Sequence, residues 1–308
     1  MTATPPAAPP RGRFAPSPTG ALHFGSLVAA VGSYADARAA GGQWLVRVDD
    51  LDREREVAGA ADLILRALDR FGLHWDGVPV YQSRRTDAYA QALAKLRERG
   101  LTFPCGCSRR EIAARGRPGP EGPIYPGTCR NGLPPGRLPR SERLRMTADR
   151  LIITDRIHGE IVQHSASEVG DFVLRRADGI HAYQLAVVID DADAGIDRVV
   201  RGADLLLSTP RQVHLQRLLD LPTPTYAHLP VALSADGHKL SKSHAALPVD
   251  PDDPLPALLG AWRFLSQPMP PEPPESVAAF WHHAIDAWSI DRVPRRRAIP
   301  VAGLPAND

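Results

Sequence analysis

The chain has 308 residues, of which 43% are hydrophobic and 23% charged, as in a globular protein with one large or two moderate domains. No apolar run reaches the length of a membrane span, and the proline-rich N-terminus lacks the apolar core of a signal peptide, so we expect a cytoplasmic protein without membrane contact. A net charge of +2 excludes a polycation as a whole.

The first predicted elements form a strand, a turn and a helix. After a proline-rich, disordered tail (1–10), residues 13–26 begin as a short apolar strand, turn through prolines and glycines, and lead into a helix over 27–40. Such a helix start offers unpaired amides and a positive dipole end to an anion, and Gly25 would let a nucleotide approach the backbone. The alternative is an ordinary proline-rich turn with His23 on the surface.

Strands and helices alternate over the first third of the chain. A short strand over 44–48 lies between the first helix and a second one over 58–71, and a third helix follows over 86–99, each helix ending at glycine. This alternation predicts an α/β fold, a parallel sheet wrapped by helices that binds ligands beyond the carboxyl ends of its strands. We place the first half of the nucleotide-binding domain at residues 11–104.

The alternation stops at Cys105. Residues 105–180 contain turns and short strands, near 143–146, 151–154 and 160–164, and are interpreted as an inserted subdomain. Helical and strand signals then resume, which places the second half of the domain at residues 181–233.

Positive charge concentrates in this insertion. Residues 109–150 hold ten arginines and four acidic residues, a local net charge of +6. A basic stretch of this kind is typical of a nucleic-acid contact with salt-dependent affinity. A solvated arginine-rich loop is the alternative.

Two of the three lysines lie in one string, Lys239-Leu-Ser-Lys242-Ser, whereas 34 of the 37 cationic residues are arginine. Where a chain uses arginine by default, a retained lysine suggests a site that needs a compact, mobile ammonium, such as one that follows a phosphate through a reaction. Chance clustering on a solvated loop is the alternative.

The two strings together resemble the paired signatures of class I aminoacyl-tRNA synthetases. His23-Phe-Gly-Ser26 is similar to the HIGH motif and residues 239–243 to the KMSKS motif. Further blocks narrow the resemblance to the glutamyl branch, over roughly residues 11–245. These blocks are Arg13–Gly20, Arg47–Asp52, Tyr183–Ala186 and Arg201–Asp204. The resemblance implies a Rossmann-like class I catalytic domain with an inserted subdomain like those that bind the acceptor end.

The same resemblance implies a glutamate site. Arg13 and Arg201 would hold the two carboxylates, Ser17 and Tyr183 would supply hydroxyl hydrogen bonds, and Asp49 would meet the α-ammonium. These residue types suit the substrate, because an amino acid with two carboxylates calls for arginine forks and one acid. The family more often has glutamate at the position of Asp49.

The resemblance also implies an ATP site, with Mg²⁺ accompanying the nucleotide. Lys242 would stabilise charge on the pyrophosphate while the amino-acid carboxylate attacks the α-phosphorus, so catalysis would rest on positioning and electrostatics. The ATP-binding residues would be Pro16, His23, Gly25, Ser26 and Lys242, and the catalytic residues His23, Lys239 and Lys242.

The cysteines form a separate pattern around a loop rich in glycine and proline. Cys105-Gly-Cys107, followed about twenty residues later by Cys129, resembles a structural Zn²⁺ site. No histidine is near enough in sequence to be the fourth ligand, but Tyr125 matches a position where one synthetase subfamily uses tyrosine. Three reduced thiols without metal are the alternative.

Residues 234–308 are predicted to hold the second motif and two helices, over 254–265 and 275–288, with no anticodon-binding domain. A glutamyl core of this length with the cysteine insertion resembles the glutamyl-queuosine tRNA(Asp) synthetase family, which activates glutamate without tRNA and transfers it to queuosine in the anticodon of tRNA(Asp). A truncated glutamyl-tRNA synthetase that charges a 3′ end and a non-catalytic RNA-binding paralogue are the alternatives. Without heptads, we expect a monomer.

Overall fold

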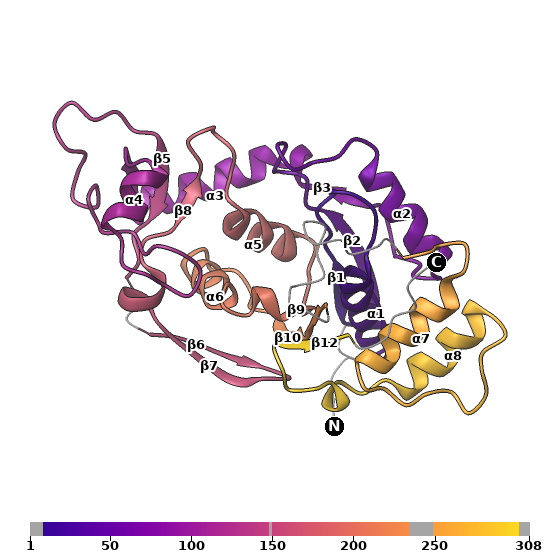
Figure 1. Cartoon of the computed structure of the whole chain (residues 1–308). Coiled ribbons are helices and arrows are strands. Elements are labelled where there is room, and N and C mark those ends of the chain that lie inside the picture. The colour runs from indigo at the N-terminus through magenta and orange to yellow at the C-terminus, as the bar shows by residue number, and fades with distance from the viewer. Residues whose placement is uncertain (1–8, 148–149, 235–248, 302–308) are drawn as a thin grey trace, which may run out of the picture.

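Parallel strands of two adjoining sheets, together called the central sheet, lie at the centre of the structure, a computed structural model that describes residues 9–147, 150–234 and 249–301. Its strands are β1 (Arg11–Phe14), β2 (Gln43–Val48), β3 (Val80–Tyr81), β9 (Arg198–Gly202) and β10 (Thr225–Leu229). Parallel pairing joins β1-β2-β3 and β9-β10. The amide of Asp197 donates to the Arg11 carbonyl at 3.2 Å, which sets β9 beside β1 (Figure 1).

Helix α1 (Phe24–Ala39) packs against this sheet. A Cβ on Gly32 would lie 2.5 Å from the Leu229 side chain, so a larger residue there would displace the helix or the leucine. Trp44 of β2 is fully buried, with its ring 5.1 Å from that of Tyr34 in α1. Three further helices extend the same apolar core, α2 (Ala60–Arg70), α7 (Pro254–Phe264) and α8 (Val277–Ala287).

A second core lies on the other side of the sheet, away from α7 and α8 (Figure 1). It is built by α3 (Thr86–Glu98), α5 (Tyr183–Asp193) and α6 (Thr209–Leu218). The apolar run of α5 faces this core and its last turn is acidic, so α5 brings carboxylates to the arginine side chains of β1 and β2.

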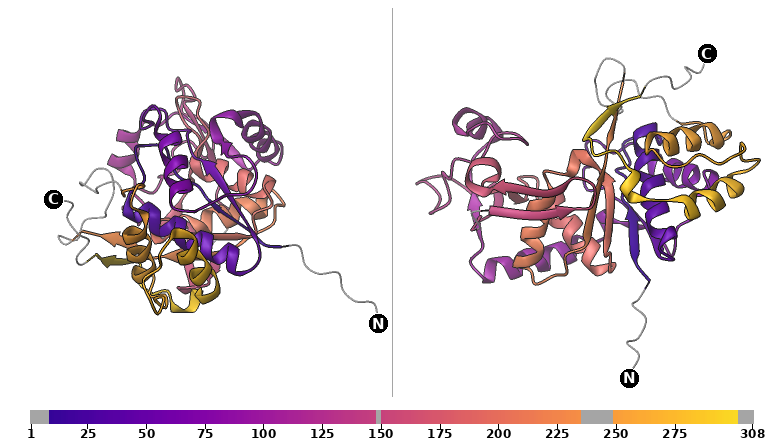
Figure 2. Two further views of the ribbon diagram at one scale, coloured as in Figure 1. Left: turned by 90° about the vertical axis from the view of Figure 1, so that its right-hand side faces the viewer. Right: turned by 90° about the horizontal axis from the view of Figure 1, so that it is seen from below.

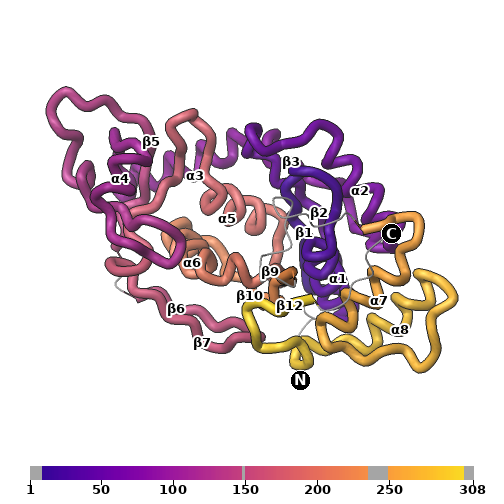
Figure 3. The backbone as a smooth tube through the Cα atoms, viewed as in Figure 1, coloured from indigo at the N-terminus to yellow at the C-terminus, as the bar shows by residue number. Residues whose placement is uncertain are grey.

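The region predicted as an insertion contains its own small antiparallel sheet, β4 (Thr102–Cys105), β5 (Ser141–Leu144) and β8 (Val173–Arg175), with the short helix α4 (Arg109–Arg115) beside it. This part lies at the end of the molecule opposite α7 and α8 (Figure 2, Figure 3).

A hairpin from the same region joins the central sheet instead. It consists of β6 (Arg150–Asp155) and β7 (Gly159–His164), which pair antiparallel. Strand β6 then pairs in parallel with β10, where Asp155 is opposite Tyr226. The hairpin therefore belongs to the same sheet as β9 and β10. The predicted boundary at residue 180, between the inserted subdomain and the second half of the catalytic domain, stays a prediction.

Most predicted elements are confirmed, with ends shifted by one to three residues. Eight elements were missed: strands β3, β4, β8 and β10, helices α4 and α6, and the paired strands β11 (Val231–Leu233) and β12 (Ala298–Pro300). Helix α4 begins at a capping box in which the Ser108 hydroxyl accepts the amide of Glu111 and the glutamate carboxylate accepts that of Ser108, a signal readable as Ser-x-x-Glu. Strand β12 (Ala298–Pro300) pairs in parallel with β11 (Val231–Leu233). Short 3-10 turns occupy Gln82–Arg84, Ala203–Leu205 and Ile290–Arg292, and a π turn Ser165–Val169.

Candidate active site

A cavity of roughly 820 Å³ opens where β1, β2 and β9 meet the N-terminus of α1, at the edge where parallel sheets bind ligands. Every predicted glutamate or ATP residue that the structure describes lines it: Arg13, Pro16, Ser17, His23, Gly25, Ser26, Asp49, Tyr183 and Arg201. Lys239 and Lys242 lie outside the described residues. The structure thus gathers these side chains in one cavity, whereas their individual roles stay predictions.

The N-terminus of α1 forms one end of this cavity. The Nδ1 atom of His23 accepts the amide of Ser26 at 3.3 Å, and its Nε2 atom lies 2.9 Å from the Ser26 hydroxyl. The helix starts at Phe24, three residues before its predicted start, because His23 caps it. Gly25 carries no side chain to cover the helix end, which suits a phosphate.

Arg201, on β9, also lines the cavity and is buried. Its Nε donates to His228 Nε2 at 3.2 Å, and its Nη2 donates to Thr209 Oγ1 at 2.8 Å and to Gln212 Oε1 at 2.7 Å. Its Nη1 is buried and has no hydrogen-bond partner among the described residues. A guanidinium that lines a cavity and has one buried, unpaired donor nitrogen suits a carboxylate as its further partner.

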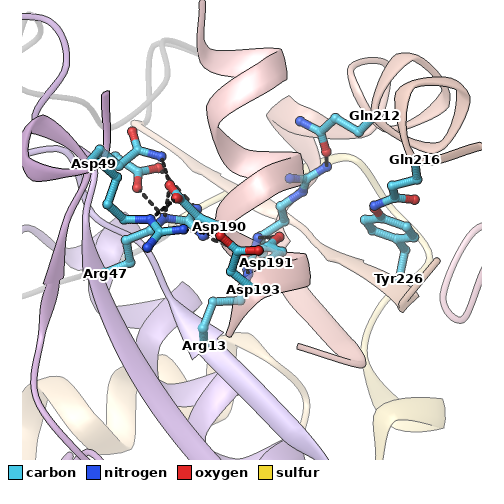
Figure 4. Close-up of polar contacts among 12 residues, drawn as sticks. Arg13, Arg47, Asp49, Asp190, Asp191, Asp193, Gln212, Gln216 and Tyr226 are labelled. Atoms are coloured by element: carbon cyan, nitrogen blue, oxygen red, sulfur yellow. Dashed lines mark hydrogen bonds and ion pairs between the residues drawn. The ribbon is translucent and has the colours of Figure 1, made fainter. Parts of the chain in front are cut away.

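Arg13 belongs to a buried network of charges (Figure 4). Its Nε and Nη2 atoms donate to the two oxygens of Asp191 at 3.2 and 3.3 Å. Arg47 donates to Asp191 at 2.5 Å and to Asp49 at 2.7 Å, and its Nε lies 3.7 Å from Asp190. Arg13, predicted to hold a glutamate carboxylate, therefore already has a protein counter-ion.

Two carboxylates of this network, Asp49 and Asp191, have pKa values that shift in opposite directions. Burial raises the pKa of Asp49, and the pairing with Arg47 offsets this only in part. Burial alone would also raise the pKa of Asp191, but the charges of Arg13 and Arg47 outweigh it and the pKa is lowered. Asp191 is thus the permanent counter-ion, whereas Asp49 lines the cavity with an ionised form that a substrate ammonium would stabilise.

Three members of the network, Arg47, Asp190 and Asp191, were missed by the sequence analysis. Their signal was present: Arg47 interrupts a buried strand, and the two acids directly follow the apolar helical run 185–189. Charged residues in apolar elements require partners. The sequence does not say which charges pair.

The cysteine pattern closes into one cluster, at the end of the molecule opposite α7 and α8. Cys105, Cys107 and Cys129 are buried, and their sulfurs lie within 4.8 Å of one another. The Cys107 and Cys129 sulfurs are 3.7 Å apart, and the Tyr125 hydroxyl lies 3.4 Å from the Cys105 sulfur. Ligands about 2.3 Å from a tetrahedral ion are about 3.8 Å apart, so the four side chains fit a zinc ion.

Residues 11–254 match a family model described as tRNA synthetases class I (E and Q), catalytic domain. The chain belongs to this family. Two class I relatives are named glutamyl-Q tRNA(Asp) synthetase. That of Dechloromonas aromatica is 56% identical, covering 94% of this chain and 98% of the relative, and that of Aromatoleum aromaticum is 55% identical, covering 94% and 92%.

Solved synthetase structures share the fold. The glutamate tRNA ligase of Elizabethkingia meningosepticum, crystallised with its amino acid, aligns with a TM-score of 0.79 at 24% identity, over 96% of this chain and 67% of the ligase. The glutamate-tRNA synthetase of Elizabethkingia anophelis gives 0.79 at 25% identity, over 95% and 68%. The predicted Rossmann-like class I catalytic fold is confirmed. In the described ranges, no helix has the length and apolarity to cross a membrane.

Proposed function

We propose that this class I synthetase is a glutamyl-Q tRNA(Asp) synthetase, which activates glutamate with ATP in the absence of tRNA and transfers it to queuosine in the anticodon of tRNA(Asp). The unused Nη1 of buried Arg201, in a cavity shared with the α1 N-terminus, carries the glutamate assignment. Relatives with this name at 56% and 55% identity over nearly their whole length support the choice of acceptor.

Different cavity residues would bind different groups of the glutamate substrate. Arg201 would bind one carboxylate of glutamate through Nη1, and Arg13, in the cavity wall with Asp191 as its counter-ion, would contribute its positive charge. Asp49 would accept the α-ammonium, because that cation restores the carboxylate that burial disfavours. The hydroxyls of Ser17 and Tyr183, both in the cavity wall, would complete the site.

Activation requires no side-chain nucleophile. An oxygen of the glutamate α-carboxylate attacks the α-phosphorus of ATP, the bond from that phosphorus to the bridging oxygen breaks, and pyrophosphate leaves. His23 and the amides at the start of α1 would hold the phosphates, and Lys242 would neutralise the leaving group. Mg²⁺ would enter with ATP and supply further charge neutralisation.

The second step is an acyl transfer. A hydroxyl of the queuosine cyclopentenediol attacks the carbonyl of glutamyl-adenylate and gives up its proton to the departing phosphate, an ester forms, and AMP leaves with the electron pair of the broken carbonyl–oxygen bond. For this step an anticodon stem-loop, rather than an acceptor end, would enter the cavity.

The proposal is tested by determining which position of the RNA becomes glutamylated. With ATP and labelled glutamate, the protein should label an anticodon stem-loop of tRNA(Asp) that contains queuosine but not the same stem-loop with guanosine. Glutamate-dependent pyrophosphate exchange should occur without RNA, and Lys242→Ala should abolish both reactions while the circular dichroism spectrum stays unchanged.

Either of two results would refute the proposed function. Label on the 3′ end of tRNA(Glu) would identify a glutamyl-tRNA synthetase that charges an acceptor. RNA binding without glutamate-dependent exchange would identify a non-catalytic RNA-binding paralogue.

A further inference from the structure

Arg201 is held by a relay that begins outside the cavity. Its Nε lies 3.2 Å from Nε2 of His228 on β10, and Nδ1 of the same imidazole lies 2.6 Å from Oδ2 of Asp155, at the end of β6. The histidine and aspartate side chains are 0% exposed. The other carboxylate oxygen of Asp155 accepts the amides of Ile157 at 3.0 Å and His158 at 2.9 Å.

These contacts fix the protons of the relay. The Nε–H of an arginine can only donate, and the Thr209 hydroxyl, 3.0 Å from the same ring nitrogen, can donate to it as well, so Nε2 of His228 is the unprotonated, accepting nitrogen. The ring proton then lies on Nδ1 and is donated to Asp155. Burial lowers the pKa of His228 to about 4 although Asp155 pulls in the opposite direction, so the ring is neutral at physiological pH.

We propose that Asp155 is a positioning residue for glutamate binding, because it selects the His228 tautomer that accepts a hydrogen bond from Arg201. With Nε fixed by His228 and Nη2 by Thr209 and Gln212, Nη1 is the guanidinium nitrogen left without a partner among the described residues, in a side chain that lines the cavity. This inference rests on the proposed function, in which Arg201 binds a substrate carboxylate.

Asp155→Asn tests the relay without changing its shape. The amide oxygen must stay on the two backbone N–H groups of Ile157 and His158, so the NH₂ group faces Nδ1 of His228. The imidazole then has to carry its proton on Nε2, which points a donor at the Nε–H of Arg201. In pyrophosphate exchange the KM for glutamate should rise on the order of 10-fold or more, as expected for a misplaced buried charged donor, while the KM for ATP stays constant.

His228→Gln provides the rescue. Its side-chain carbonyl can accept from Arg201 and has no tautomer to reverse, so adding Asp155→Asn to His228→Gln should change the KM for glutamate little. The two substitutions are therefore expected to be strongly non-additive. Asp36→Asn is the matched control: Asp36 is equally buried and bonded to Arg156 at 2.8 Å, and its other partners are Arg198 and Trp288 rather than His228.

Nitrogen-15 NMR of labelled histidine gives a readout that does not require activity. The resonance that disappears in His228→Gln should show a protonated Nδ1 and an unprotonated Nε2, and the reverse in Asp155→Asn. An Nε2-protonated His228 in the natural protein overturns the relay, whether or not Asp155→Asn folds. An unchanged KM for glutamate in a folded Asp155→Asn protein overturns it as well. Absence of glutamate-dependent exchange in the natural protein would instead refute the proposed function, and the NMR result would still decide the relay.

Discussion

At the scale of single residues, the candidate glutamate site is electrostatically organised before any ligand arrives. Asp191 accepts hydrogen bonds from both Arg13 and Arg47, so these two cations are fixed by a carboxylate that is not itself in the cavity wall. Fixed charges need no reorganisation when a substrate binds, which is the main source of electrostatic stabilisation in enzymes. The cost is that every member of the buried network depends on its partners.

Asp191→Asn should therefore lower the free energy of unfolding by about 3–5 kcal/mol, because it leaves two buried arginines short of a counter-charge. Urea denaturation measures this value. Asp193→Asn on the same helix is the control: its partner is Arg85, its side chain is 53% exposed, and the expected change is within about 1 kcal/mol.

The stability difference between the natural protein and Asp191→Asn should depend on pH. The pKa of Asp191 is lower in the folded protein, so its contribution to stability is fully present above the ordinary carboxyl pKa of about 3.9 and is lost as the pH falls through the lowered value. The stability difference between the natural protein and Asp191→Asn should shrink across that acidic range. A difference that stays constant there would show that Asp191 acts through packing rather than charge.

At the scale of elements, the sequence was a good guide wherever the signal was local. Helices α1, α2 and α3 were placed by apolar spacing and by the glycines that follow them, and their ends are within three residues of the prediction. What joins the elements was not predictable. The Arg13–Asp191 pair spans 178 positions and the Asp155–His228 pair spans 73, and neither has a local pattern that names its partner.

The loop around the cysteines is an element that a metal should hold. It contributes few apolar side chains, and its buried centre consists of the three sulfurs with Phe103 and Tyr125. We expect one zinc ion per chain by mass-spectrometric metal analysis, and Cys129→Ser should lose at least about nine-tenths of it, because a structural site needs all four ligands. Ser141→Ala, which removes only a hydroxyl contact to the Cys105 carbonyl, should retain the metal. A natural protein that contains no metal would leave three reduced thiols as the correct interpretation.

At the scale of the whole molecule, the basic stretch of residues 109–150 is separate from the cavity, since none of its described residues lines it. Of the ten arginines in residues 109–150, six are exposed and the others are at least partly buried in contacts such as the Arg130–Asp171 and Arg137–Glu111 pairs. The exposed set is Arg109, Arg110, Arg115, Arg117, Arg140 and Arg150. Internal pairing thus removes part of the +6 charge, but leaves an exposed group available for RNA phosphates.

The affinity for RNA should fall steeply as the salt concentration rises. The double variant Arg109→Gln, Arg110→Gln should reduce the slope of log affinity against log salt concentration by about 1–2, because each lost phosphate contact lowers that slope by about 0.7–0.9. Fluorescence anisotropy with a tRNA(Asp) stem-loop measures the slope. Arg295→Gln with Arg296→Gln, also exposed, is the charge-matched control and should leave it unchanged. If the natural protein shows no salt dependence, the basic region is not the docking surface.

The β6–β7 hairpin limits how this protein could be recombined with its relatives. Between the cysteine loop and the return to α5, the hairpin adds β6 to the central sheet beside β10 and provides the carboxylate that orients His228. Exchanging residues 105–180 as one module would therefore replace part of the amino-acid site together with the peripheral sheet. A chimera that retains residues 150–164 with their own β10 would separate RNA docking from glutamate recognition, two properties that could then diversify independently.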